Sequence, residues 1–103
     1  MQIVLRSHNA KVAPVVREKA EQAITKLARR LRRTVDATVW FEHDGPTRRV
    51  EIILRAPRHR RLVAEGRARQ YGTALDRALK HLATQTNHAK RPPKERARRA
   101  TKK

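Results

Sequence analysis

The sequence predicts an α+β fold in which a four-stranded sheet carries two helices packed on one face, a β-α-β-β-β-α sandwich. Four segments place apolar residues at every second position, which is the pattern of a half-buried strand. Two longer segments repeat apolar residues at every third or fourth position, which is the pattern of an amphipathic helix. Each predicted helix has a single apolar stripe, so both helices are expected on the same face of the sheet.

The N-terminal third of the chain is predicted to form one strand and one helix. The strand covers Gln2–Arg6 and leads into a short polar stretch. The helix is expected from about Val12 to Arg33, with Pro14 in its first turn, where a missing backbone donor costs nothing. Its apolar stripe comprises Val16, Ala20, Ala23, Ile24, Leu27, Ala28 and Leu31.

Three further strands are predicted to follow one another as a meander. The first of them covers 35–42, where the side chains alternate in polarity, and it is followed by His-Asp-Gly-Pro at 43–46, which is turn chemistry. The next strand centres on 50–54 and ends before Pro57. A basic turn, Arg-His-Arg-Arg, then leads into the last strand, which ends at Ala68.

From Tyr71 onward the period of the apolar residues changes to that of a helix. The predicted core stripe comprises Ala74, Leu75, Ala78, Leu79, Leu82 and Thr86. The opposite side of this helix carries Arg77, Lys80, His81, Thr84 and His88, and no carboxylate. One stripe is therefore suited to the core and the other to an anion.

The charge of the chain points to a polyanionic partner. Lysine and arginine number 27 against 9 acidic residues, which gives a net charge of +18 and a pI of about 11.9. Solubility alone needs a net charge of only about 2–8. Nucleic acid is favoured over membrane, because the predicted helices lack the bulky apolar residues that insert into lipid.

A cluster of cations ends the first predicted helix. Five of the eight residues from Lys26 to Arg33 are basic, whereas Glu18 and Glu21 stand near the helix start. Complementarity to the helix dipole explains the order of the signs but not the number of cations. This helix end is therefore also expected to face RNA.

The chain is predicted to divide into a folded domain, residues 1–91, and a basic C-terminal tail, residues 92–103. From Lys90 onward, eight of fourteen residues are Lys or Arg and none is a large apolar residue. Two consecutive prolines, Pro92 and Pro93, stop the helix. Such a tail is expected to be disordered when free and to condense on phosphates when bound, although a purely solubilising role is the alternative.

Catalytic and metal-binding patterns are not found in this sequence. There is no cysteine, and His81 and His88 stand about 10 Å apart along a helix, too far to share an ion. No carboxylate pair, nucleophile or glycine-rich phosphate loop can be recognised. We therefore expect no enzyme, no metal and no cofactor. No segment has the pattern of a membrane span or a signal peptide, so a cytoplasmic location is expected.

The three aromatic residues argue against recognition of single bases. Trp40 and Phe41 are adjacent in a predicted strand, so they point to opposite faces and cannot form a stacking pair. Binding is therefore expected to rest on backbone contacts and shape, which favours a folded RNA.

The passage from the fourth strand into the second helix contains two runs of residues that identify a family. The first reads Gln-Tyr-Gly-Thr-Ala-Leu-Asp at 70–76, and the second includes Leu82, Gln85 and Lys90. With the opening Met-Gln-Ile and the order of elements, these runs resemble the ribosome hibernation-promoting factor and ribosome-associated inhibitor family over residues 1–91. Members carry a tract D-x-Y-x-A-I-D, which Ala74 and Asp76 match. It is followed by K-L-x-x-Q-L-x-x-x-K, in which His81 here replaces a lysine and Thr86 a leucine.

Two departures from the family tract concern the start of the second helix. The tyrosine stands one position early, with Gly72 in its usual place, and Gln70 replaces the capping aspartate. Glutamine caps a helix poorly and glycine lowers helix propensity, so the sequence does not determine the first turn. Longer members carry a C-terminal domain that pairs ribosomes. This chain ends without one, so any ribosome pairing is expected to need another factor.

The resemblance implies a non-catalytic factor that binds the small ribosomal subunit in the mRNA and tRNA channel. It implies competition with mRNA and tRNA, translational silencing of idle ribosomes under stress, and a monomer when free. The residues expected to contact rRNA are Lys26, Arg29, Arg30, Arg33, Arg77, Lys80, His81, His88, Lys90 and Arg91. The alternatives are a general binder of double-stranded RNA or nucleoid DNA, which acts through backbone charge, and an RNA-processing enzyme.

Overall fold

Six elements follow one another in the predicted order β-α-β-β-β-α. The structure is a computed structural model that describes residues 2–8, 10–29, 36–56 and 59–90. The elements are β1 (Gln2–His8), α1 (Pro14–Ala28), β2 (Asp36–Asp44), β3 (Thr47–Ala56), β4 (His59–Ala68) and α2 (Tyr71–Lys90).

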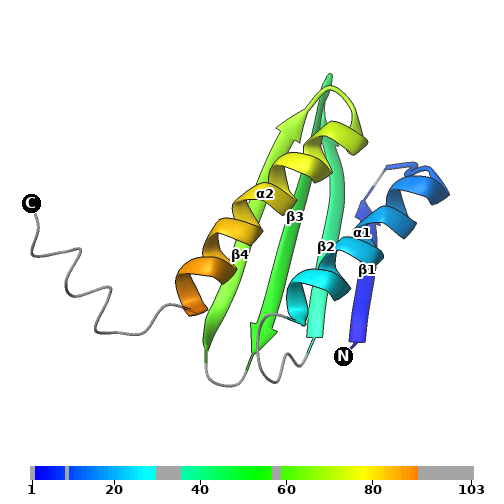
Figure 1. Cartoon of the computed structure of the whole chain (residues 1–103). Coiled ribbons are helices and arrows are strands. Elements are labelled where there is room, and N and C mark those ends of the chain that lie inside the picture. Colours follow the sequence, from blue (N-terminus) through cyan, green and yellow to red (C-terminus); the bar gives the residue numbers. More distant parts are fainter. Residues whose placement is uncertain (1, 9, 30–35, 57–58, 91–103) are drawn as a thin grey trace, which may run out of the picture.

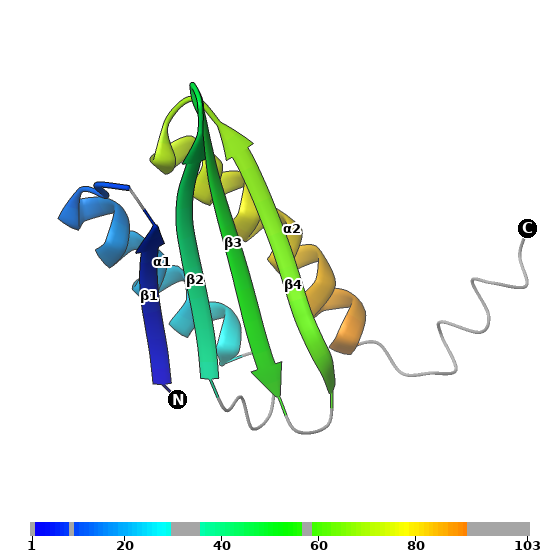
Figure 2. The ribbon, with the colours of Figure 1, turned by 180° about the vertical axis from the view of Figure 1, so that it is seen from behind.

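The four strands form one mixed sheet in the order β1-β2-β3-β4. β1 runs parallel to β2 and is connected to it through α1, whereas β2, β3 and β4 form the predicted antiparallel meander. Both helices cover the same face of this sheet (Figure 1), and the view from behind shows the other face without a helix (Figure 2). The predicted α+β fold, with two helices on one face, is confirmed.

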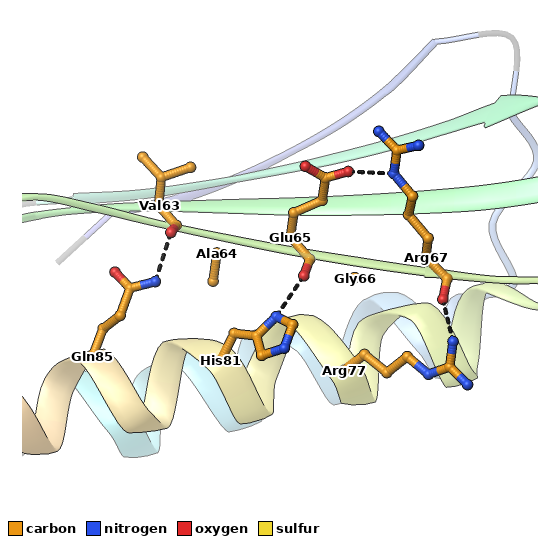
Figure 3. Close-up of a pocket in the computed structure, with 8 residues that line it drawn as sticks. All are labelled: Val63, Ala64, Glu65, Gly66, Arg67, Arg77, His81 and Gln85. Atoms are coloured by element: carbon orange, nitrogen blue, oxygen red, sulfur yellow. Dashed lines mark hydrogen bonds and ion pairs between the residues drawn. The ribbon is translucent and has the colours of Figure 1, made fainter.

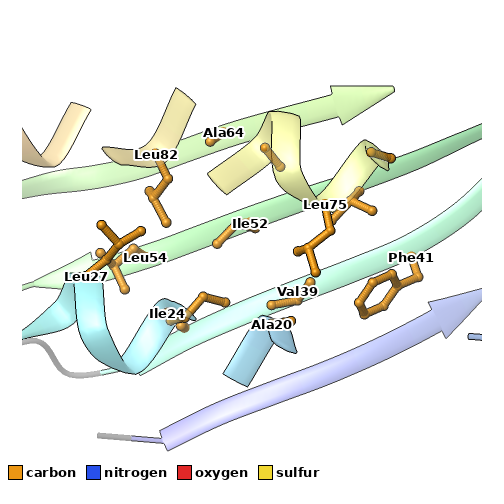
Figure 4. Close-up of a cluster of buried hydrophobic side chains, with 14 residues drawn as sticks. Ala20, Ile24, Leu27, Val39, Phe41, Ile52, Leu54, Ala64, Leu75 and Leu82 are labelled. Atoms are coloured by element: carbon orange, nitrogen blue, oxygen red, sulfur yellow. The ribbon is translucent and has the colours of Figure 1, made fainter. Parts of the chain in front are cut away.

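The core lies between the helices and the sheet and is built from aliphatic side chains (Figure 4). Along β2 and β3 every second side chain is buried, which confirms the period of two. Phe41 is the largest fully buried side chain, and its ring meets that of Tyr71 edge to face with centroids 5.9 Å apart. The buried apolar residues are Ala20, Ile24, Leu27, Ala28, Ala37, Val39, Phe41, Val50, Ile52, Leu54, Ala64, Ala74, Leu75, Ala78 and Leu82.

The first helix begins later than the sequence predicts. α1 starts at Pro14 instead of Val12, because Ala13 is extended with φ −60° and ψ 141°. A residue that precedes proline is disfavoured in helical conformation by contact with the proline ring. At the other end Ala28 is the last helical residue and Arg29 caps the helix. The remaining predicted helical positions, 30–33, lie outside the described residues.

The strands are longer than their apolar alternation indicates. β2 and β3 extend to Asp44 and from Thr47, so the turn contains only Gly45 and Pro46 and not the four residues predicted. Gly45 has φ +60°, a conformation that glycine adopts without steric cost at the first position of a two-residue hairpin turn. β1 continues to His8, which pairs with Glu42, and β4 begins at His59.

The second helix begins at Tyr71, where the sequence period changes. The backbone N–H of Ala74 donates to the carbonyl of Gln70 at 3.0 Å, so helical bonding starts from that residue despite its weak capping side chain. Arg91 and the predicted tail, 92–103, lie outside the described residues. Within the described residues no helix is long and apolar enough to cross a membrane.

Candidate nucleic-acid interface

The two helices present a common charged surface on the side away from the sheet, which we call the helix face. The Nζ atom of Lys19 on α1 lies 2.6 Å from Oδ1 of Asp76 on α2, so an ion pair connects the helices. Apart from Asp76, the carboxylates on these helices are Glu18 and Glu21. The exposed basic residues of the helix face are Arg17, Lys19, Lys26, Arg29, Arg77, Lys80 and His81.

Two of the predicted RNA contacts lie at the C-terminal end of α1. Lys26 occupies the last turn and Arg29 the capping position, and both side chains are exposed. They line a shallow depression together with Glu21, Gln22 and Thr25. Their charges complement the partial negative charge of the helix end and remain open to an anion. The predicted contacts Arg30 and Arg33 lie outside the described residues.

On α2, Lys80 is the predicted contact that points freely into solvent. Its side chain is exposed and has no partner among the described residues, although Thr84 donates to its backbone carbonyl at 3.1 Å. His88 and Lys90 stand on the last turns of α2, where the side chains are not described. Arg91 follows the helix and lies outside the described residues.

Three side chains of α2, those of Arg77, His81 and Gln85, form a row that is hydrogen-bonded to the edge strand of the sheet (Figure 3). Nη1 of Arg77 donates to the carbonyl of Arg67 at 2.6 Å, and Nε2 of Gln85 donates to that of Val63 at 2.7 Å. Between them, Nδ1 of His81 lies 2.8 Å from the carbonyl oxygen of Glu65. β4 is an edge strand, and these bonds occupy carbonyls that no neighbouring strand reaches.

This row changes the interpretation of two predicted contacts. Arg77 and His81 are exposed, as expected for an RNA-facing surface, but both also hold α2 on β4. A carbonyl oxygen only accepts hydrogen bonds, so Nδ1 of His81 carries the proton and Nε2 remains for another partner. The sequence analysis did not assign Gln85 a place in the site. Gln85 stands four residues after His81 and eight after Arg77, so the sequence could have placed all three on the same side of the helix.

Two open hollows lie beside this row. One, of about 540 Å³, is formed by the residues that join α2 to β4, from Val63 to Arg67 and from Arg77 to Gln85. The other, of about 480 Å³, lies at the start of α2 and includes Thr47, Arg69, Gln70, Thr73 and Arg77. Hydrogen-bond donors dominate the side chains of the second hollow, which suits contact with phosphate oxygens.

The sheet surface without helices, which we call the open face, has a different chemistry. Arg49 is bound there by three carboxylates: Nη1 to Glu42 at 2.6 Å, Nη2 to Glu51 at 2.6 Å and Nε to Glu65 at 2.8 Å. The hydrogen bond from Arg49, followed by that from Arg67, lowers the pKa of Glu65 below its ordinary value. The bond to Glu65 in turn raises the pKa of Arg49. Each of these three carboxylates is therefore paired with at least one arginine of the open face.

The aromatic residues and histidines do not form a further site in the part of the chain that the structure describes. Phe41 is fully buried whereas Trp40 is half-buried on the open face, so the two rings point to opposite sides as predicted. Burial raises the pKa of Tyr71, whose hydroxyl has no hydrogen-bond partner among the residues that the structure describes. No group of three or more His, Asp or Glu residues is arranged to hold a metal within the described ranges.

The sequence model of one protein family, described as sigma 54 modulation protein / S30EA ribosomal protein, matches residues 3–92. The chain belongs to this family. The match covers the folded part from β1 to the end of α2, which includes both helices of the helix face. It is a family of ribosome-associated proteins without enzymatic activity, and the resemblance inferred from the tract at 70–76 is confirmed.

Two solved structures have the same fold. A ribosomal subunit interface protein from Coxiella burnetii superimposes with a TM-score of 0.79 at 17% identity, over 87% of this chain and 98% of that chain. The N-terminal domain of Protein Y from Thermus thermophilus gives a TM-score of 0.69 at 23% identity, over 86% of this chain and 96% of that chain. At these identities the likeness establishes the fold alone. No curated protein sequence matches the chain.

Proposed function

We propose that this protein is a ribosome hibernation factor that binds the small ribosomal subunit through its helix face. In this role it occupies the channel between head and body, overlaps the path of mRNA and the anticodon ends of tRNA, and keeps idle ribosomes silent under stress. It acts in the cytoplasm as a monomer, without catalysis or cofactor. Family membership, together with the cationic helix face, carries this proposal.

Electrostatics gives the helix face its affinity for rRNA. Each lysine or arginine that neutralises a phosphate releases condensed counterions, and this entropy gain is the main source of backbone binding. Lys26 and Arg29 on α1 and Lys80 on α2 are exposed and occupy the same side of the sheet. A rigid pair of helices therefore offers cations from two elements to the phosphates that line one channel, and a bound helix pair excludes other polyanions from it.

The fold holds this surface rigidly, which favours binding to a preformed RNA shape. The Lys19–Asp76 ion pair and the Arg77, His81 and Gln85 bonds fix α2 relative to α1 and to β4. Binding then requires little ordering of the described protein surface, which limits the entropic cost of association. No aromatic platform lies among the cations, so the account predicts recognition of shape and backbone instead of base sequence.

Reversal of the charges of Lys26 and Lys80 to glutamate is expected to abolish subunit binding without loss of the fold. Both side chains are exposed, and neither forms an ion pair among the described residues. Arg77 is less suitable, because its substitution also removes the bond to β4. Binding is measured by co-sedimentation with purified small subunits, and folding by circular dichroism. Undiminished binding by the folded double variant would rule out this surface.

Competition separates the proposed function from general nucleic-acid binding. The protein is sedimented with small subunits in the presence and absence of mRNA with initiator tRNA, and separately with excess duplex RNA or DNA. We expect mRNA with tRNA to displace the protein and free duplex to have little effect. Displacement by duplex alone would instead identify a general backbone binder, the alternative that the net charge of +18 also allows.

A further inference from the structure

The open face is electrically balanced, in contrast to the remainder of the molecule. Side chains that alternate away from the helices gather here, as the strand registers require. The basic members are Arg6, Arg49, Arg55, Arg61 and Arg67, and the acidic members are Asp36, Glu42, Asp44, Glu51 and Glu65. Five cations therefore stand against five carboxylates on a chain whose net charge is +18. Most described acids lie on this one surface.

The central cation of the open face is bound through all three of its nitrogens, whereas each carboxylate around it keeps one oxygen free. All three nitrogens of the Arg49 guanidinium donate to carboxylate oxygens. Each of the three carboxylates uses a single oxygen in these bonds. The second oxygens of Glu42, Glu51 and Glu65 have no partner among the described residues. The centre of the face thus offers acceptors from three neighbouring strands and few donors.

An apolar row runs beside these acceptors. Val4, Thr38, Ile53 and Val63 are register partners across all four strands, and Trp40 stands on the same face one row further. Val63 is 40% exposed and is one of two large hydrophobic residues that are exposed in the described chain. A row of apolar side chains flanked by carboxylate acceptors suits a polypeptide that carries both apolar and basic side chains.

RNA does not fit this surface. A phosphate would meet the free oxygens of three carboxylates, and the central cation, Arg49, is already paired with those carboxylates through each of its three nitrogens. A second copy of the chain is also disfavoured, because two molecules of net charge +18 repel each other. A lysine or arginine of another protein finds acceptors, and its neighbouring apolar side chains find Val63, Ile53 and Trp40.

We propose that the open face binds a basic segment of a protein of the small ribosomal subunit while the helix face binds rRNA. This inference rests on the proposed function, since it places both partners in the same subunit. It gives the two sides of the sheet different partners, one of nucleic acid and one of polypeptide. The charge segregation between the helix face and the open face is the observation that carries it.

Site-specific crosslinking tests this assignment directly. The chain has no cysteine, so Val63→Cys and Thr84→Cys each provide a unique attachment point for a benzophenone maleimide. On purified small subunits we expect the probe at position 63 to crosslink to a ribosomal protein and the probe at 84 to rRNA. Crosslinks from 63 to rRNA, to a second copy or within the chain would overturn the proposal, as would no crosslink from 63 beside a productive 84. Failure of both variants to bind subunits would count against the proposed function itself.

A charge substitution gives a second, independent test. Val63→Lys adds one positive charge where the partner is expected to be basic. It is expected to weaken binding to subunits by about tenfold or more, because like charges brought together across an interface repel each other. The matched control is Val15→Lys, which adds the same charge at an exposed valine of α1. Against protein-free rRNA neither variant should bind more weakly than the parent protein. Equal subunit affinity of the two variants would contradict the proposal.

Discussion

At the scale of single residues, Gly66 determines how closely α2 approaches the sheet. A Cβ atom at this position would lie 2.0 Å from the carbonyl oxygen of Ala74 and 2.5 Å from the backbone nitrogen of Ala78. Both neighbours are backbone atoms of α2 and cannot turn away. The glycine therefore places the helix near enough for its side chains to reach the carbonyls of β4, which links this residue to the geometry of the site.

Substitution of Gly66 by alanine is expected to destabilise the fold by about 1–3 kcal/mol or more, the range for overpacking a close contact. Gly72→Ala is the matched control, because an added Cβ there meets nothing within 4 Å. That control should stabilise the protein by about 0.4–1 kcal/mol, since alanine loses less conformational entropy on folding than glycine does. Urea unfolding measures both. Equal stability of the two variants would contradict the close approach of α2 at Gly66.

The Arg49 cluster predicts a dependence of stability on pH. The pKa of Glu65 is lowered in the folded state, chiefly by its bond to Arg49. A carboxyl with a lowered folded pKa contributes stability that is present above its unfolded pKa, ordinarily 4.5. This contribution is lost as the pH falls through the folded value.

Replacement of Glu65 by glutamine should therefore lower the free energy of unfolding near neutral pH and flatten its decline in acid. Unfolding by urea is measured from about pH 7 to about pH 2.5, a range that spans the titration of carboxyl groups. Asp44→Asn serves as the control, because that carboxylate has no ion-pair partner among the described residues. If the free energy of unfolding of Glu65→Gln varied with pH in parallel to that of the parent protein, Glu65 would not contribute to the pH dependence of stability.

At the scale of elements, the period of the apolar residues identified all six helices and strands and their order. It did so because each element has one buried side, which repeats every second residue in β2 and β3 and every third or fourth in α2. The bounds were less accurate. The extra length of β2 and β3 depends on pairing between Asp44 and Thr47, and α1 starts late because of the conformation of Ala13. Neither the strand pairing nor the conformation of Ala13 changes the spacing of apolar residues, so the apolar pattern could not predict these bounds.

The candidate site was predictable only in part. The sequence placed Lys26, Arg29 and Lys80 on exposed helix surfaces, where the structure also has them. It did not reveal that Arg77 and His81 bond to β4, because these bonds depend on the position of α2 along the strand. Gly66 sets that position through close contact with the backbone of Ala74 and Ala78, which the apolar pattern does not show. The RNA contacts themselves stay a prediction.

Substitutions on α2 should affect stability and RNA binding separately, because the row formed by Arg77, His81 and Gln85 holds the helix whereas Lys80 faces solvent. Gln85→Ala removes the bond to Val63 and is expected to cost about 0.5–1.5 kcal/mol of stability, the net value of one hydrogen bond. It should leave subunit affinity nearly unchanged. Lys80→Ala is the complementary variant, expected to weaken binding and to preserve stability. A Gln85→Ala protein of unaltered stability would show that the bond from Gln85 to Val63 does not help to hold α2 on β4.

At the scale of the whole molecule, the sheet separates two surfaces with different charge. The helix face carries six exposed lysine and arginine residues against three carboxylates, and the open face carries five arginines against five carboxylates. A merely soluble protein has no need for such separation. It gives the molecule one side suited to phosphates and another without a net positive charge to attract them.

The salt dependence of RNA binding measures this separation. Each cation that contacts a phosphate contributes about 0.7–0.9 to the slope of log affinity against log salt concentration. Lys80→Gln is expected to reduce the slope by that amount. Arg55→Gln, a change on the open face near Asp36, should leave the slope unaltered. A larger effect of Arg55→Gln than of Lys80→Gln would reverse the assignment of the two faces.

The most direct test of the central claim, that the helix face lies in the channel of the small subunit, uses a single tethered cleavage reagent. Because the chain has no cysteine, Thr84→Cys accepts iron–EDTA at one defined, exposed point of α2 and leaves the cations of the helix face in place. On purified small subunits the account predicts hydroxyl-radical cleavage of rRNA at nucleotides that line the channel between head and body, abolished by mRNA with initiator tRNA. Cleavage scattered over the subunit surface, or unaffected by those ligands, would contradict it.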